Sequence, residues 1–310
     1  MLMNNPMPAY RKKILFIGLS CVGDVVMTSP ILGILHEKFP NAIIDVVADY
    51  RSKNLYENLP GLGKIFLKNK GHFLRGIPAL IRQLWATKYD IIVDVRTDGL
   101  SYLLRAEKRY TKMFARSYGE HAVEALMGVI FSLHGENKVP DTSIWLSEKE
   151  RKKANMQLSF FSNKDRLLAV CAGDVRRPNK CWSSNKLIEL INKYEKKFTG
   201  VLFLGGELDK ERTLEVADKI GIQNLNTIGS SLLESAAFLE NSILFLGPDS
   251  GLGHIASAVN TPVVSMFSVD SPKRCRPWGK NVICLEGKNK DARNILITDV
   301  DNAIKEIVNE

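Results

Sequence analysis

The sequence lacks any apolar run close to the roughly 20 residues that a membrane-spanning helix needs. Its first residues, MLMNNPMPAYRKK, carry their positive charge after a polar stretch and have no apolar core in front of it. A secretory signal has the opposite order, with positive charge first and an apolar segment next. We therefore expect neither export nor membrane insertion, and a cytoplasmic protein.

Cysteine is also scarce. Its five copies are odd in number and include no C-x-x-C pair, which argues against both a disulfide framework and a zinc site; they are Cys21, Cys171, Cys181, Cys275 and Cys284. What the chain does have is 310 residues, 45% hydrophobic and 25% charged. That composition is typical of a globular protein, and the length predicts two domains, each with its own core.

The positive charge is concentrated in the first half. Residues 1–160 hold 23 Lys and Arg against 15 Asp and Glu, a net charge of +8, whereas residues 161–310 hold 20 against 19, a net charge of +1. A basic field of this kind suits nucleic acid, an anionic membrane surface or an acidic small substrate, and it is also found on ordinary solvated surfaces. Charge alone leaves these four interpretations open.

Short β-branched runs alternate with amphipathic stretches, a pattern that predicts parallel strands joined by crossover helices. The fold class is therefore α/β. Helices are expected near Val25–Lys38 and Ile77–Thr87 in the first half. The expected strands are Lys13–Leu19, Ala42–Ala48, Lys64–Leu67, Tyr89–Val95, Leu167–Cys171, Val201–Leu204, Ile243–Leu246, Val263–Phe267 and Val282–Leu285.

A charged, helix-prone segment at Ser147–Gln157 and a polar stretch at Ser162–Asp165 separate the two series of strands. We place the boundary there, which gives domains 1–161 and 162–310 and leaves open whether the final helix packs on the second domain or on the first. Two doubly wound Rossmann-like domains facing an interdomain cleft are expected. Ligands bind such sheets beyond the carboxyl ends of the strands, so the loops at those ends are candidate sites.

The loop after the first strand runs from Gly18 to Asp24 and reads GLSCVGD. A phosphate loop would need Lys followed by Ser or Thr after its second glycine, and Asp24 stands there instead. The spacing does not give G-x-G-x-x-G either. Asp24 is therefore either a helix N-cap or a general base facing the cleft.

Two loops of the second half carry groups suited to phosphate. Arg176, Arg177 and Lys180 crowd into the loop after Leu167–Cys171, where they suit a diphosphate or form a solvated basic turn. The loop after Ile243–Leu246 reads GPDSGLGH, and its glycines and the amides of the next helix can bind an anion without side-chain charge. His254, at the end of this loop, suits either a packing role or hydrogen-bond donation.

These three loops together resemble the heptosyltransferase family of bacterial lipopolysaccharide synthesis, also called glycosyltransferase family 9, which has the two-domain GT-B fold. The resemblance rests on GDVVMTSP from Gly23 to Pro30 and on DSGLGH from Asp249 to His254, followed by Ala256, Ala258 and Pro262. It runs nearly end to end. The usual Phe-Gly after the last donor strand is Phe267-Ser268 here, and a longer Asp174–Asn179 insert replaces the usual hydroxyl residues.

The resemblance implies an inverting transfer with Asp24 as the catalytic base and Lys180, in a K-x-W motif with Trp182, on the donor phosphates. It implies that Asp249 holds the donor sugar and that Glu207 reaches the ribose. Together with the basic loop and His254, this gives a candidate donor-binding set of Arg176, Arg177, Glu207, Asp249, Ser250, Gly251, Leu252 and His254. The implied donor is ADP-heptose, bound in the second domain, and the acceptor is Kdo-lipid A, bound in the first, with no cofactor or metal.

The anionic acceptor accounts for the basic first half and implies a cytoplasmic protein at the inner face of the inner membrane. The segment Phe73–Trp85 either rests on the membrane or packs on the core. A GT-B transferase using another nucleotide sugar, and a non-catalytic nucleotide-binding or nucleic-acid-binding α/β protein, are the alternatives. No recognition helix, zinc finger or RNP-like motif supports nucleic acid, and no protein partner is predicted.

Overall fold

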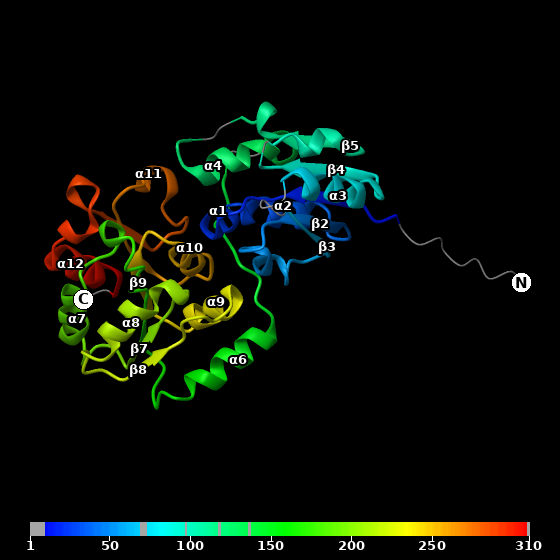
Figure 1. Ribbon diagram of the computed structural model, residues 1–310. Coiled ribbons are helices and arrows are strands. Elements are labelled where there is room, and N and C mark those ends of the chain that lie inside the picture. The colour runs from blue at the N-terminus through cyan, green and yellow to red at the C-terminus, as the bar shows by residue number, and fades with distance from the viewer. Residues whose placement is uncertain (1–9, 69–72, 97, 117–118, 136–137, 309–310) are drawn as a thin grey trace, which may run out of the picture.

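The protein folds into two α/β domains that lie side by side (Figure 1), as described by a computed structural model covering residues 10–68, 73–96, 98–116, 119–135 and 138–308. The described part of the first domain forms a five-stranded parallel sheet in the order β3-β2-β1-β4-β5. Its strands are β1 (Lys13–Ile17), β2 (Ile43–Ala48), β3 (Leu62–Leu67), β4 (Tyr89–Asp94) and β5 (Ala106–Thr111).

The second domain is built around a six-stranded parallel sheet in the order β11-β10-β9-β6-β7-β8. Its strands are β6 (Leu167–Val170), β7 (Gly200–Phe203), β8 (Asn224–Asn226), β9 (Leu244–Pro248), β10 (Val263–Phe267) and β11 (Val282–Glu286). Both orders are doubly wound, and the direction of winding reverses between β1 and β4 and between β6 and β9. Ligands bind at such reversal points, so the loops after these four strands are the places to look for a site.

Helices cover both faces of each sheet. Leu80 and Leu84 of α3 pack on one face of the first sheet, while α7 and α12 cover one face of the second. The helices are α1 (Val22–Met27), α2 (Ser29–Lys38), α3 (Phe73–Trp85), α4 (Ala122–Met127), α5 (Phe131–His134), α6 (Glu148–Leu158), α7 (Ser184–Lys193), α8 (Lys210–Ala217), α9 (Leu232–Glu240), α10 (Gly251–Ala258), α11 (Pro272–Cys275) and α12 (Ile297–Val308). Among the described residues, no helix is both long and apolar enough to cross a membrane.

All nine strands expected from the sequence are present, with ends that differ by a residue or two. The edge strands β5 and β8 were not predicted. β5 reads AEKRYT and is only partly buried, and β8 has three residues, so neither forms the apolar run that marks a buried parallel strand. The single helix expected at Val25–Lys38 is two helices, because α1 ends at Thr28 and α2 restarts with Pro30 in its first turn.

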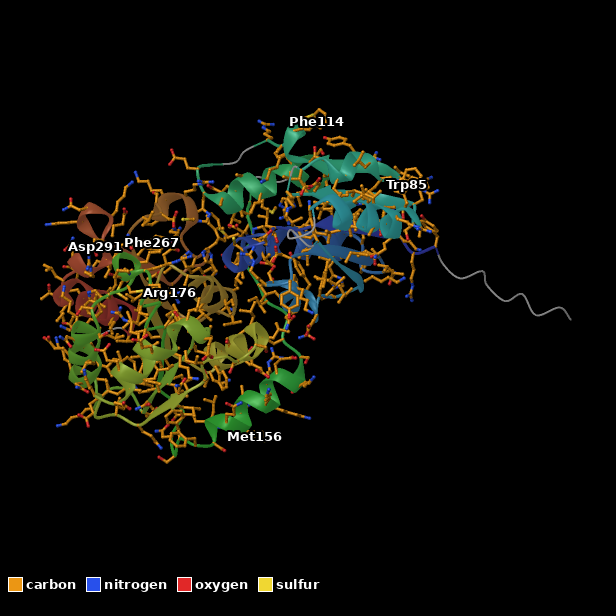
Figure 2. The ribbon with its side chains drawn as sticks, viewed as in Figure 1. Trp85, Phe114, Met156, Arg176, Phe267 and Asp291 are labelled. Atoms are coloured by element: carbon orange, nitrogen blue, oxygen red, sulfur yellow. The ribbon has the colours of Figure 1, made fainter. Side chains whose placement is uncertain are left out.

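The connection between the domains departs from the expected boundary. Helix α6 lies before residue 161, yet it packs against α9 of the second domain, and Arg151 forms an ion pair with Glu240 at 2.9 Å. By packing, the second domain therefore starts before α6. Figure 2 shows Met156 of α6 far from Trp85 and Phe114, which lie on the first domain. Helix α12 packs on α7, β10 and β11, which answers the question left open by the sequence in favour of the second domain.

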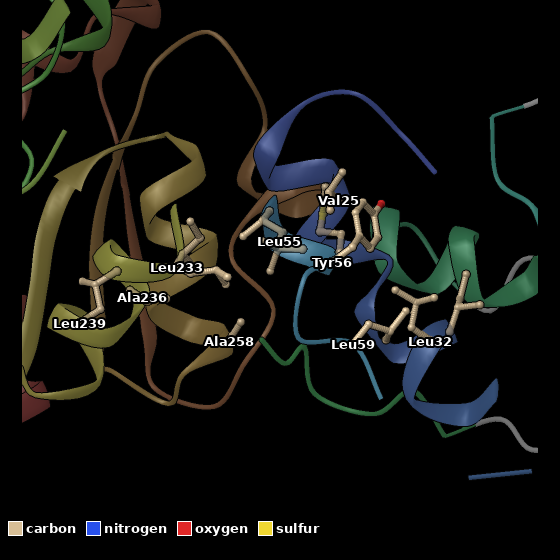
Figure 3. Close-up of a cluster of buried hydrophobic side chains, with 14 of the residues drawn as sticks. Val25, Leu32, Leu55, Tyr56, Leu59, Leu233, Ala236, Leu239 and Ala258 are labelled. Atoms are coloured by element: carbon tan, nitrogen blue, oxygen red, sulfur yellow. The ribbon is translucent and has the colours of Figure 1, made fainter. Parts of the chain in front are cut away.

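A continuous hydrophobic cluster joins the two domains. Figure 3 shows Val25 and Tyr56 of the first domain in one cluster with Leu233 and Ala258 of the second. Helix α1 of the first domain packs on α10 of the second. A Cβ atom on Gly251 would lie 2.6 Å from Val22 Cγ1, and one on Gly23 would lie 2.7 Å from the ring of His254. Glycine at these two positions lets the helices of the two domains touch.

Candidate active site

A cavity of about 400 Å³ opens where the loops after β6, β7 and β9 meet at the domain border. The second domain supplies most of its wall, and Val22 at the start of α1 is the contribution of the first domain among its described lining residues. This volume lies within the usual range for small-molecule sites. The charged and polar side chains of the lining are Asp174, Arg177, Lys180, Asp209, Ser230, Ser235, Asp249 and Ser250, and Gly251 and Leu252 also line it.

The start of α10 forms one wall of this cavity. Ser250 is the N-cap residue but makes no side-chain capping bond, and its buried Oγ has no hydrogen-bond partner among the described residues. The first amides of a helix likewise have no partner inside the helix. Unused donors together with the positive end of the helix dipole suit an anion. Ser250, Gly251 and Leu252 therefore form a wall whose free donors suit an anion, and we call it the anion-binding wall.

Lys180 lies opposite this wall, between two carboxylates. Its Nζ is 2.8 Å from an oxygen of Asp270 and 3.7 Å from one of Asp249. Burial raises the pKa of Asp249 to about 6, with Asp270 adding to the rise and Lys180 opposing it. Partial burial disfavours the ammonium, but the two carboxylates outweigh it and raise the pKa of Lys180. The cation at the cavity edge is thus held in its charged form.

Asp24 is not an N-cap. Cys21 occupies that position in α1, and Asp24 is the third helical residue, so the capping interpretation is wrong. Burial raises the pKa of Asp24, while Lys112, Arg274 and a hydrogen bond with Cys21 act in the opposite direction. Arg274 belongs to α11 of the second domain. Asp24 is not among the residues that line the cavity, but charges from both domains, Lys112 and Arg274, act on it. Its raised pKa makes it a better proton acceptor than an exposed carboxylate.

Two of the expected donor-binding residues, Arg176 and Glu207, do not line the cavity. Arg176 pairs with Asp174 at 2.9 Å and does not line the cavity, whereas its neighbour Arg177 does. Glu207 is also outside the lining, with a side chain 74% exposed and paired with Lys210 at 3.2 Å. Its neighbour Asp209 lines the cavity instead and accepts a 2.7 Å hydrogen bond from the Gly206 amide.

His254 serves the domain contact rather than the cavity. Its ring is buried against Gly23, and its Nδ1 finds no hydrogen-bond partner within the described part of the chain. Burial, with a smaller effect of His121, lowers the pKa of His254 to about 4, so the ring is neutral at physiological pH. His121 stacks on Trp278 with ring centroids 4.7 Å apart. Of the two roles that the sequence left open for His254, the structure supports packing.

Asp209 and Asp270 are the site residues that sequence reasoning missed. Asp209 lies two residues after Glu207, to which the family resemblance drew attention. Asp270 lies 90 residues after Lys180 in the chain, in the loop after β10. That loop follows a predicted strand at the ligand-binding edge of the sheet, which is the signal that could have found Asp270.

Comparisons with known proteins agree with this geometry. "Lipopolysaccharide heptosyltransferase 3" of Escherichia coli K12 is 26% identical over 292 residues, covering 84% of each chain. Among solved structures, a glycosyl transferase family 9 protein from Veillonella parvula superposes with a TM-score of 0.84 at 21% identity, covering 98% of this chain and 99% of that one. "E. coli ADP-heptose lps heptosyltransferase II" gives 0.79 at 20% identity, with coverage of 96% and 98%.

These two structures share the arrangement of two parallel-sheet domains, so the fold is GT-B. The family model described as glycosyltransferase family 9 (heptosyltransferase) matches residues 97–303. That span covers the end of the first domain from before β5, helix α6, and the second domain as far as Ala303 in α12. It includes the cavity with Lys180 and the start of α10. The chain therefore belongs to glycosyltransferase family 9, the heptosyltransferase family, and is a glycosyltransferase.

Proposed function

We propose that this protein transfers heptose from ADP-heptose to the Kdo-lipid A inner core of lipopolysaccharide, at the cytoplasmic face of the inner membrane. The observation that carries the proposal is the cavity that unites Lys180, Asp249 and the amide wall of α10 in a member of this family. The relatives support the substrate class, because they include lipopolysaccharide heptosyltransferases 2 and 3 and an ADP-heptose enzyme.

On the donor side, a diphosphate fits between the α10 amides and Lys180. The amides of Ser250, Gly251 and Leu252 would donate to phosphate oxygens, and Lys180 and Arg177 supply positive charge from the facing loop. Asp249 lies on the sugar side of this arrangement and can accept hydrogen bonds from sugar hydroxyls. Asp209 lines the same cavity from the segment after β7 and offers a carboxylate to the ribose, the role that the resemblance implied for Glu207.

The reaction is a single displacement at the anomeric carbon. An acceptor hydroxyl oxygen forms a bond to that carbon while its proton passes to the carboxylate of Asp24. The bond between the anomeric carbon and the diphosphate oxygen breaks, and both its electrons leave with ADP. Lys180 and the α10 amides stabilise the charge that develops on this leaving oxygen. The anomeric configuration is inverted, because attack and departure occur on opposite sides.

The test is product formation from defined substrates. The protein is incubated with ADP-heptose and either Kdo-lipid A or Kdo-lipid A that already carries heptose, and products are identified by mass. We expect one added heptose and one ADP released per turnover. GDP-sugars and UDP-sugars serve as competitors in thermal unfolding, since a ligand that binds the folded state raises its stability. Stabilisation by one of these, with no turnover of ADP-heptose, would assign a different donor.

A further inference from the structure

Five large apolar side chains stand exposed along the outer edge of the first domain, around the edge strand β5. We call them the β5-edge patch. Phe114 is 78% exposed and Met113 71%, values far above those of core residues. The others are about half exposed. The members of the β5-edge patch are Trp85, Tyr102, Leu103, Met113 and Phe114, of which Trp85 and Phe114 are labelled in Figure 2.

Contacts among these residues hold them in place as one surface. The indole nitrogen of Trp85 donates to the Leu103 carbonyl at 2.6 Å. The hydroxyl of Tyr102 lies 3.0 Å from Thr111 Oγ1 and 3.9 Å from Met113 Sδ. The short 3₁₀ helices η3 (Leu100–Leu103) and η4 (Lys112–Phe114) carry most of the patch, at the two ends of a sheet edge. The apolar side chains are therefore displayed by ordered backbone, not by a loose loop.

The surroundings of the patch are strongly basic. Residues 105–116 contain five Lys or Arg and a single acidic residue, Glu107, which pairs with Lys88 at 2.9 Å. Arg105 stacks over the ring of Trp85 at 5.7 Å, and Lys108 is exposed beside it on β5. Apolar side chains flanked by exposed cations match a surface that is apolar inside and negative outside, which describes an anionic lipid bilayer.

Part of the patch lies at the same edge of the sheet as the proposed base. Met113 and Phe114 follow the carboxyl end of β5, and Asp24 follows the carboxyl end of β1 in the same parallel sheet. The charge of Lys112, which directly precedes Met113, acts on the carboxyl of Asp24. A membrane docked at Met113 and Phe114 would thus present a lipid-linked sugar at the edge of the sheet that carries Asp24. By contrast, the apolar stripe of α3 is turned inward, since Leu80 and Leu84 are buried in the first domain. Trp85, at the end of α3, remains for contact with a membrane.

We propose that the β5-edge patch docks this enzyme on an anionic membrane surface, with Phe114 and Met113 entering the lipid headgroup region and the neighbouring cations contacting lipid phosphates. This inference rests on the proposed function, because a lipid-linked acceptor is what makes docking useful. It differs from that function in having a readout that needs neither donor nor acceptor.

The experiment measures binding of the full chain to vesicles of phosphatidylethanolamine with phosphatidylglycerol, compared with neutral phosphatidylcholine vesicles. We expect binding to the anionic vesicles that weakens as salt rises. The double variant Met113→Ser with Phe114→Ser should bind about a hundredfold more weakly, since each of the two apolar side chains contributes about tenfold when buried. Lys108→Glu should also weaken binding. Met156→Ser is the matched control, because Met156 is 70% exposed on α6 of the second domain.

Transferase activity separates this proposal from the proposed function. With a water-soluble acceptor lacking acyl chains, the double variant should turn over like wild type, whereas with acceptor in vesicles it should be slower. Unchanged vesicle binding by the double variant would overturn the proposal, as would equal binding of wild type to neutral and anionic vesicles. Dimerisation of wild type that the double variant abolishes would assign the patch to a second copy instead. Activity without vesicle binding would leave the proposed function intact while overturning the membrane surface.

Discussion

The variant Asp24→Asn tests whether Asp24 acts as the catalytic base or only stabilises the fold. Asn has nearly the same shape as Asp but cannot accept the proton of an acceptor hydroxyl. Because Cys21 is the N-cap of α1, the change removes no capping hydrogen bond from the Asp24 side chain. What it removes from the fold is a negative charge in the first helical turn, a contribution of about 0.3–1 kcal/mol.

Burial of that charge acts against this contribution. The raised pKa of Asp24 means that its ionised form is disfavoured in the folded state relative to an exposed Asp, so neutral Asn relieves a cost. The net change in the free energy of unfolding should therefore stay within about 1 kcal/mol, a shift in Tm of roughly 2–4 °C at most for a chain of this size. Urea unfolding followed by circular dichroism measures it.

Activity should respond far more strongly. A positioned base contributes about 10²- to 10⁴-fold, so kcat should fall by that factor while ADP binding, measured by calorimetry, is unchanged. In the wild type, kcat/KM should decline as acid protonates Asp24, starting at a higher pH than an ordinary Asp would give, because its pKa is raised. In Asp24→Asn this decline of kcat/KM at acid pH should be absent.

A matched control is available in α12. Asp299 is also the third residue of its helix and is exposed, far from the cavity lining. Asp299→Asn should lose the same helix-dipole contribution and keep full activity. Near-normal kcat in Asp24→Asn would refute the catalytic assignment, and equal losses of activity in both variants would show that the change acts through the helix and not through proton transfer.

Three further changes probe the donor side. The pKa of Asp249 is raised to about 6, so its ionised form destabilises the fold above that pH. Asp249→Asn should therefore raise the free energy of unfolding at pH 7.5 by at most about 3 kcal/mol, and by little at pH 4, as urea titrations would show. The same change should weaken donor binding, which calorimetry measures. Gly251→Ala should lower the free energy of unfolding by about 1–3 kcal/mol, because the new methyl group pushes on Val22. Adding Val22→Ala should restore both stability and ADP affinity. Failure of this rescue would mean that the methyl group obstructs the ligand itself. Asp209→Asn should weaken ADP binding at least fivefold and Glu207→Ala hardly at all, and the reverse order in calorimetry would return the ribose role to Glu207.

The central strands of both sheets could be predicted from the sequence because parallel strands buried on both faces must be continuous apolar runs. Strand β4, with every residue buried, is such a case. Strand β5 lies at the edge of the sheet and exposes the charged side chains of Glu107 and Lys108. Its sequence therefore contains no apolar run that would predict a strand. The packing of α6 could not be predicted for a related reason. Its sequence is that of a charged segment, and only the fold shows it against α9, with Ala154 and Leu158 buried in the hydrophobic cluster.

At the site, sequence reasoning found the loops but not always the residues within them. The motif loops lie at the reversal points of the two sheets, where the fold requires ligands to bind. Which of two nearby side chains enters the cavity depends on the local direction of the backbone. Arg177 lines the cavity and Arg176 does not, and Asp209 lines it and Glu207 does not. Asp270 reaches Lys180 only because β10 ends beside β9 in the sheet, a neighbour relation that no local pattern encodes.

The two motifs that carry the family resemblance turn out to touch each other. Gly23 of the first motif receives the ring of His254 from the second, and Gly251 of the second receives Val22, the residue before Gly23. Asp24 follows Gly23 directly, and the α10 amides begin at Gly251, so one helix contact sets the position of the proposed base relative to the anion-binding wall. A side chain larger than hydrogen at either glycine would separate two groups that the displacement needs within bonding reach of one anomeric carbon. Gly23 and Gly251 therefore allow the close packing of α1 on α10 that would hold the proposed base near the anion-binding wall.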